Sequence, residues 1–310
     1  SNCSISLWFC FYRTATLLPN QTKPVIINDS IVPDRISMHH PPSYHDISKK
    51  VEDLLNDDYS LKKTIKAKHS TPQKVSFTLE NEKKDLGVMG KLQVKYAHQP
   101  SGLSLDKVVL AQDGGKSAEF SVSKLAPGFK LKGKINDSMK GDIGFEYEKP
   151  QLTFHSKLNS ELTKLTSSGT MSYEGIILGG HLKYNLPKAK AGELDDYNLA
   201  VSYGRKGWFT SLMTTNKMST YNLGATYDIS RAVTAAVMAS ATPESSKKNL
   251  TLGIKYTCNP MTTIKAKATS EGDLHGSVQH TCVKGLVVGV ATKMNATEKQ
   301  PTFGFNCTLG

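Results

Sequence analysis

The stretch NLTLGIKYTCNPMTTIKAKATSEGDLHGSVQHT, residues 249–281, holds two alternating runs that follow each other across a tight turn. In the first run, apolar residues at positions 250, 252, 254 and 256 alternate with small or polar ones. After the turn at Asn259-Pro260, apolar Ile264 alternates with basic Lys265 and Lys267. A period of two indicates a β-strand with two different faces. One face is apolar and the other is basic, so the question is which solvent covers the apolar face.

The same period of two continues through the chain from Ser60 onward. Short polar or glycine-containing links separate the runs, as at residues 113–115 and 271–273, which indicates an antiparallel meander of hairpins. The clearest runs cover residues 75–79, 92–96, 129–135, 143–147, 152–158, 197–203, 221–227, 286–290 and 303–309. Residues 60–310 give about one strand per 13 residues, which suits strands of about 10 residues that cross a membrane.

Composition favours a membrane barrel over a soluble sandwich. Hydrophobic residues make up 38% of the chain, below the roughly 45–50% of ordinary globular proteins. No run of about 18 apolar residues predicts a membrane-spanning helix, but barrel strands show only weak alternation. Polar residues persist in mid-strand, and Tyr and Phe recur near strand ends. We therefore expect the apolar face to meet lipid, the basic face to line an aqueous lumen, and the wall to close.

One segment before the strands has helical periodicity, PPSYHDISKKVEDLLNDDY at residues 41–59. Ser43 and Asp46 resemble a capping box after a Pro-Pro start. An apolar stripe at helical spacing consists of Tyr44, Ile47, Val51, Leu54 and Leu55. A helix of about sixteen residues is too short to span a bilayer, so it is expected to lie against another surface.

These residues resemble one family, the eukaryotic mitochondrial porins or voltage-dependent anion channels, from about Pro41 to Gly310. The resemblance rests on the helical segment, on LAPGFKLKGKI at residues 125–135, on MSYEG at residues 171–175, and on the stretch at residues 256–280. It departs from the family in a shortened link at residues 59–61 and at Ile176, where some relatives carry Trp.

The resemblance implies an all-β fold, a transmembrane antiparallel β-barrel of about 19 strands with an N-terminal amphipathic helix in the lumen. An odd count requires the first and last strands, near Thr64 and Phe305, to pair in parallel. Some family members carry a carboxylate on the lipid face of the fourth strand. The nearest match here is Lys107 beside Asp106, so roles attributed to that acid are not transferred.

The sequence divides into three parts. Residues 61–310 are the expected barrel, and residues 38–60 are the helix segment and its linker. Residues 1–37 hold a short apolar run, SISLWFCFY, followed by a Pro- and Asn-rich stretch, and the first methionine is Met38. We expect residues 1–37 to be a disordered or artefactual extension, and the alternative is a targeting or anchoring segment.

The expected function is a voltage-gated, weakly anion-selective pore of the mitochondrial outer membrane that passes small ions, ATP, ADP and phosphate. The net charge of +12 favours anionic partners, and basic residues in a wide lumen raise the local anion concentration. The lysines expected to line the pore are Lys62, Lys66, Lys68, Lys130, Lys132, Lys134, Lys157, Lys183, Lys255, Lys265, Lys267 and Lys293. The stripe of the helix is expected to take part in gating.

The sequence and the resemblance also indicate which partners and which alternative functions to expect. Membrane lipid surrounds the barrel, a homo-oligomer is possible, and the resemblance implies docking of cytosolic kinases or apoptosis regulators, with no nucleic acid. The alternatives are a barrel of the mitochondrial protein-import type and a soluble β-rich binding protein. We expect no enzyme, cofactor or metal, because the five scattered cysteines lack CxxC spacing and DGGKS at residues 113–117 lacks the spacing of a nucleotide-binding loop.

Overall fold

The structure is a computed structural model that describes residues 40–84, 87–98, 100–138, 140–186, 192–245, 247–295 and 300–310. The expected extension at residues 1–37 lies outside the described residues. In chain order the elements are η1 (Tyr44–Asp46), α1 (Lys49–Asn56), β1 (Lys63–Ser70), β2 (Val75–Lys84), β3 (Gly87–His98), β4 (Leu103–Ala111), β5 (Lys116–Ala126), β6 (Phe129–Asn136), β7 (Gly141–Lys149), β8 (Leu152–Asn159), β9 (Lys164–Tyr173), β10 (Ile176–Asn185), β11 (Glu193–Arg205), β12 (Trp208–Thr215), β13 (Thr220–Asp228), β14 (Val233–Thr242), η2 (Pro243–Ser245), β15 (Lys247–Asn259), β16 (Thr262–Thr269), β17 (Asp273–Val283), β18 (Leu286–Asn295) and β19 (Thr302–Leu309).

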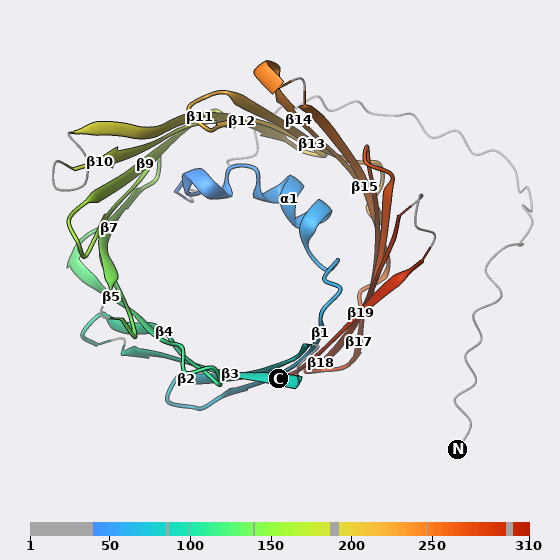
Figure 1. The fold of residues 1–310 in the computed structure, drawn as a ribbon, viewed down its shortest axis with the longest axis horizontal. Coiled ribbons are helices and arrows are strands. Elements are labelled where there is room, and N and C mark those ends of the chain that lie inside the picture. Colours follow the sequence, from blue (N-terminus) through green and yellow to red (C-terminus); the bar gives the residue numbers. More distant parts are fainter. Residues whose placement is uncertain are drawn as a thin grey trace, which may run out of the picture. The chain divides into compact units, whose positions relative to one another are not determined.

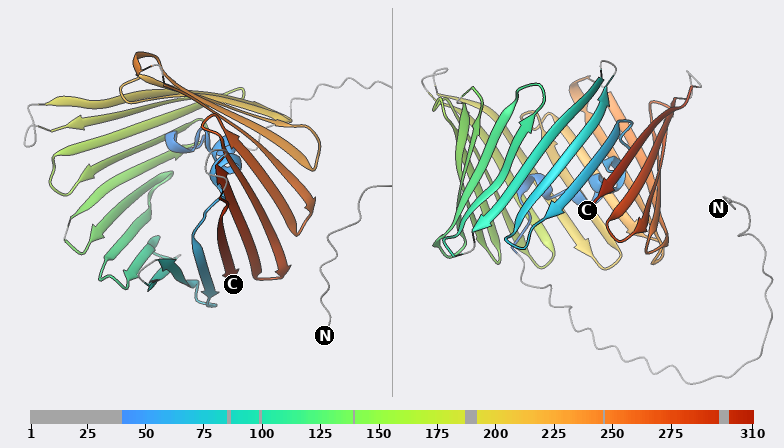
Figure 2. Two further views of the ribbon diagram at one scale, coloured as in Figure 1. Left: turned by 45° about the vertical axis from the view of Figure 1, so that its right-hand side comes forward. Right: turned by 90° about the horizontal axis from the view of Figure 1, so that it is seen from below.

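The described strands form one closed sheet of 19 strands (Figure 1). Each strand pairs antiparallel with the next, and β1 pairs in parallel with β19, with Lys63 opposite Phe305 and Thr64 opposite Asn306. Closure gives the backbone of every strand a partner on both sides, as hydrocarbon requires. Figure 2 shows the strands tilted in side view, as barrel closure demands. The predicted barrel is confirmed, including its parallel seam.

The register separates the two faces of the wall. In the stretch that decides the fold, Lys255 pairs with Lys265 on the side of the helix, and Ile254 pairs with Ala266 on the outside. Outer side chains are exposed, with Leu252 at 51% and Ile254 at 43%. The apolar face is therefore the outer surface of the barrel. Within the described ranges, no helix is both long enough and apolar enough to cross a membrane.

The predicted helix is shorter than expected and is divided in two, a 3-10 turn at Tyr44–Asp46 and α1 at Lys49–Asn56. Ser43 is the N-cap residue of the first turn, but its hydroxyl donates to the Asp46 carboxylate at 2.6 Å instead of accepting a backbone N–H. The chain starts α1 anew at Ser48, whose carbonyl accepts hydrogen bonds from the backbone N–H groups of Val51 and Glu52. Two short segments can follow a concave wall, which one straight helix cannot (Figure 1).

Candidate functional site

The lumen and the helix inside it form the candidate site. The turn η1 packs on β9 and β10, and α1 packs on β13, β14 and β15. The whole predicted stripe, Tyr44, Ile47, Val51, Leu54 and Leu55, is buried, with at most 5% of any of these residues exposed. Burial of one such side chain contributes about 1.5–3 kcal/mol to the docking free energy. Burial of the stripe is therefore the main contribution that holds the helix to the wall.

Glycines on the inner face make room for this stripe. A β-carbon at Gly179 of β10 would lie 2.5 Å from Cδ1 of Ile47, and one at Gly253 of β15 would overlap the side chain of Leu55. A β-carbon at Gly224 of β13 would lie 3.1 Å from a methyl group of Val51, a contact tighter than usual. We call these three glycines the floor of the helix. Because glycine has no β-carbon, these positions let the helix lie closer to the wall than a residue with a side chain would allow.

Hydrogen bonds hold the segment that leads into the helix. The hydroxyl of Thr153 donates to the carbonyl of Pro41, and the hydroxyl of Thr170 donates to that of Pro42, both at 2.7 Å. Both prolyl carbonyls belong to residues just before η1, so β8 and β9 fix the entry of the chain into the lumen. Neither threonine was expected to have a role, because a lone Thr in a strand carries no signal in the sequence.

Ionisable groups of the helical segment respond to this burial. Burial raises the pKa of Tyr44 to about 12, with a further contribution from the charge of Asp196. Burial likewise raises the pKa of Tyr59 to about 12, with Asp58 contributing. The hydrogen bond from Ser43 lowers the pKa of Asp46. Both phenols therefore stay neutral, and their burial does not place a charge beneath the helix.

Eleven of the twelve predicted lysines lie on strands at positions of the inner register, the side on which the helix lies, and Lys62 directly precedes β1. For nine of the twelve the ammonium lies within ion-pair distance of a carboxylate. The pairs are Lys62–Glu82, Lys66–Glu80, Lys130–Asp106, Lys132–Glu146, Lys134–Glu119, Lys157–Asp142, Lys183–Asp196, Lys265–Asp58 and Lys293–Asp273. Most of the predicted basic charge in the lumen is therefore matched by a nearby acid.

The other three lysines have different surroundings. Lys68 and Lys255 make no ion pair with any carboxylate in the described part of the chain, and both lie on strands, β1 and β15. The ammonium of Lys267 lies 4.7 Å from the ring centroid of Tyr59, over the ring face. A cation held over an aromatic ring gains about 0.5–2 kcal/mol, so Lys267 helps to fix the linker between α1 and β1.

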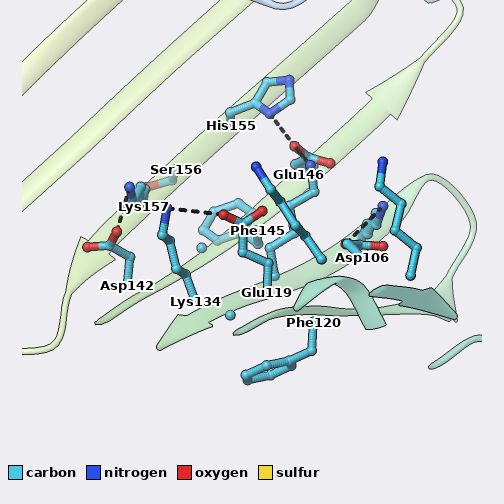
Figure 3. Close-up of a pocket in the computed structure, with 16 residues that line it drawn as sticks. Asp106, Glu119, Phe120, Lys134, Asp142, Phe145, Glu146, His155, Ser156 and Lys157 are labelled. Atoms are coloured by element: carbon cyan, nitrogen blue, oxygen red, sulfur yellow. Dashed lines mark hydrogen bonds and ion pairs between the residues drawn. The ribbon is translucent and has the colours of Figure 1, made fainter. Parts of the chain in front are cut away.

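The pairs on β4 to β8 line a recess of about 580 Å³ on the inner wall (Figure 3). Lys134 binds Glu119 at 3.1 Å, and Lys157 binds Asp142 at 2.6 Å. Glu146 accepts hydrogen bonds from Lys132 and from the ring of His155. Figure 3 shows these charges alternating across neighbouring strands. Partly exposed pairs of this kind contribute about 0–1 kcal/mol each, so their main effect is on the local field.

Sequence reasoning missed further lysines on the inner register, among them Lys91, Lys95 and Lys107. Lys91 and Lys95 face the same side as Gln93, opposite the alternating apolar residues of β3, and this alternation was a usable signal. Lys107 lines the recess because the register shifts at a bulge between Leu105 and Lys107. A bulge breaks the period of two, so alternation alone cannot place Lys107.

Within the part of the chain that the structure describes, no three His, Cys, Asp or Glu side chains are grouped to hold a metal ion. The lumen thus consists of a docked helix, a row of ion pairs and a few unpaired lysines. This arrangement provides an aqueous path lined with charge.

Comparison with known proteins agrees with this geometry. Residues 40–304 match the model of the family described as eukaryotic porin. The mitochondrial outer membrane protein porin of Neurospora crassa is 24% identical over 268 residues, with 82% of this chain and 92% of the relative covered. Mitochondrial outer membrane protein porin 5 of Oryza sativa subsp. japonica is 22% identical, and the match covers 88% of this chain and 99% of the relative. The outer plastidial membrane protein porin of Pisum sativum is 23% identical, and the match covers 87% of this chain and 98% of the relative.

Among solved structures, a mutant of Rh. blastica porin is similar, with a TM-score of 0.44 and 10% identity over 72% of this chain and 89% of that one. The exposed apolar outer wall and the match to a family of membrane proteins exclude the soluble alternative. The chain therefore belongs to the eukaryotic porin family and is a membrane-embedded, pore-forming channel of the mitochondrial outer membrane.

Proposed function

We propose that this channel is weakly anion-selective, is gated by voltage, and passes small ions and metabolites such as ATP, ADP and phosphate. The observation that supports the proposal is the set of lysines on the inner register, such as Lys66, Lys132 and Lys157, together with Lys91, Lys95 and Lys107. Nine of the twelve predicted lysines are matched by carboxylates, so the remaining excess of positive charge is modest. A modest excess in a wide aqueous lumen favours anions weakly and binds none tightly.

Voltage gating is proposed for the helix and the wall around it. The helix carries Lys49, Lys50, Glu52 and Asp53 in one short segment, and apolar contacts hold it to the wall. A charge that crosses the whole membrane field gains or loses about 2.3 kcal/mol per 100 mV. That energy is comparable to the burial of one apolar side chain, whereas the stripe buries five, so several charges of the helix and the wall must move through the field together to offset docking.

Charge reversal of ion-paired lysines on the inner wall tests selectivity. In planar bilayers, Lys66→Glu with Lys132→Glu should move the reversal potential in a KCl gradient toward cations. Lys66 and Lys132 pair with Glu80 of β2 and Glu146 of β7 on the inner face. The new glutamates therefore add negative charge to that face. The field is screened over about 8–10 Å, so the summed wall charge and not one site sets the shift.

The matched control carries the same charge on the outer face. Ile65→Glu with Leu131→Glu places carboxylates in hydrocarbon, where a charged residue at mid-membrane costs up to about 2–4 kcal/mol. These variants should fail to insert. Wild-type anion preference in the lysine variants would refute the proposed selectivity, and it would leave the barrel itself untouched. Homo-oligomers and docking of kinases or apoptosis regulators stay expectations from the family resemblance.

A further inference from the structure

Lys265 differs from every other ion-paired lysine of the lumen in its burial. Its side chain is 10% exposed, whereas those of the other eight paired lysines are 36–62% exposed. Lys265 is on β16, directly opposite Lys255 of β15, which faces the same lumen without an ion pair to any described carboxylate. Two neighbouring lysines on one face of the wall therefore occupy different environments.

The ammonium of Lys265 contacts the end of the helix through three oxygen atoms. Nζ lies 3.0 Å from the carbonyl oxygen of Asp53, 3.4 Å from that of Asp57 and 2.8 Å from Oδ2 of Asp58. An ammonium has three hydrogens to donate, so the three oxygens match its capacity. Asp58 has φ = 72°, and this left-handed turn lies where its carboxylate meets the lysine.

The helix needs such a cation from outside because its own sequence supplies none. The last carbonyls of an α-helix have no partner within the helix, and its C-terminus carries a partial negative charge. α1 has no basic residue in its last turn, and Asp53, Asp57 and Asp58 add further negative charge there. Burial raises the pKa of Asp57, and the charge of Asp53 raises it further. The end of the helix is therefore electrostatically unfavourable until Lys265 covers it.

We propose that Lys265 is a positioning residue that fastens the C-terminal end of the lumenal helix to the wall. Its charge is matched by Asp58 and by two carbonyls and is shielded from the lumen, so its main effect is on the position of the helix. An effect on gating rests on the proposed function, in which the helix takes part in voltage gating. The fastening of the helix does not.

The test compares Lys265→Gln with Lys255→Gln, two cross-strand neighbours that lose the same charge. The full chain, with its cysteines replaced by serine, carries Val51→Cys as a probe, because Val51 is fully buried between helix and wall. Labelling of Cys at position 51 by a water-soluble maleimide reports release of the helix in proteoliposomes. Planar bilayers report the reversal potential and the half-closing voltage of the same variants.

Lys265→Gln should raise the labelling rate about tenfold, the change expected from loss of a charge-assisted hydrogen bond. It should also change the half-closing voltage. Lys255→Gln should leave the labelling rate unchanged and shift the reversal potential toward cations. Lys265→Arg keeps the charge and donors and should restore most of the wild-type labelling rate.

Asp58→Asn removes the carboxylate from the helix side and should raise labelling in the same direction, so the inference stays testable if Lys265→Gln does not fold. Labelling as slow as wild type in both Lys265→Gln and Asp58→Asn would overturn the inference. Faster labelling with unchanged gating would support the fastening role and refute the helix as a gating element.

Discussion

The inner wall of the barrel differs between the side that carries the helix and the side that faces it (Figure 1). Under the helix, the inner face presents small residues, among them Gly179, Ala200, Gly224, Ala236 and Gly253. On β1 to β8 the same register presents a ladder of lysines and carboxylates. One side provides a shape into which an apolar helix fits, and the other provides a hydrated, charged surface.

This contrast shows how one alternating pattern can serve two purposes. Inward positions need only avoid burying an unpaired charge, so they can be small where the helix covers them and charged where water covers them. The helix and the small-residue side depend on each other, since neither buries apolar surface without the other. The ladder depends on neither. Changes on the two sides should therefore affect different properties of the channel.

The largest effect is expected from charge in the apolar stripe. Leu54→Asp with Leu55→Asp removes two buried side chains that contribute about 1.5–3 kcal/mol each and places carboxylates against the wall. The helix should leave the wall, the voltage dependence should change, and the barrel should stay inserted. Bilayer recording measures the voltage dependence, and resistance to alkaline carbonate extraction measures whether the barrel stays inserted. Unchanged voltage dependence would separate the helix from gating and break the proposed link between its docking and channel closure.

A smaller effect is expected from filling the floor. Gly179→Val places methyl groups where Ile47 and Tyr44 lie, and overpacking of this kind typically costs about 1–3 kcal/mol. The helix should be displaced at its N-terminal end, with an altered conductance or half-closing voltage. Gly180→Val on the outer face is the matched control, because its nearest neighbour, Leu199, lies 3.9 Å from the added β-carbon. Equal behaviour of both variants would show that the floor has no special role.

The smallest effect is expected from pH. Asp57 has a raised pKa in the docked state, so docking should strengthen as pH falls toward its ordinary value of about 3.9. Asp46 has a lowered pKa, so its contribution to docking is present above that value and is lost only below it. Between pH 7 and 4.5 the half-closing voltage of wild type should therefore change more than that of Asp57→Asn. The same change in both proteins would exclude Asp57 as its source.

The sequence by itself determined which way most side chains point. A period of two is a local property of the strand, so alternation assigned Lys66, Lys132 and Lys255 to the inner face without knowledge of any partner strand. The apolar stripe was likewise visible from helical spacing alone. The resemblance supplied the strand count and the parallel seam, which alternation does not specify.

Only the tertiary structure decided what each inward side chain meets. Ion pairs such as Lys66–Glu80 form between separate strands, so they depend on the register and not on local spacing. Lys265 has the same local pattern as Lys255, and only the position of the helix end makes one a buried contact and leaves the other facing the lumen. The glycine floor is also undefined until the helix lies on it. Local periodicity sets direction, whereas burial and charge pairing arise from contacts between segments far apart in the chain.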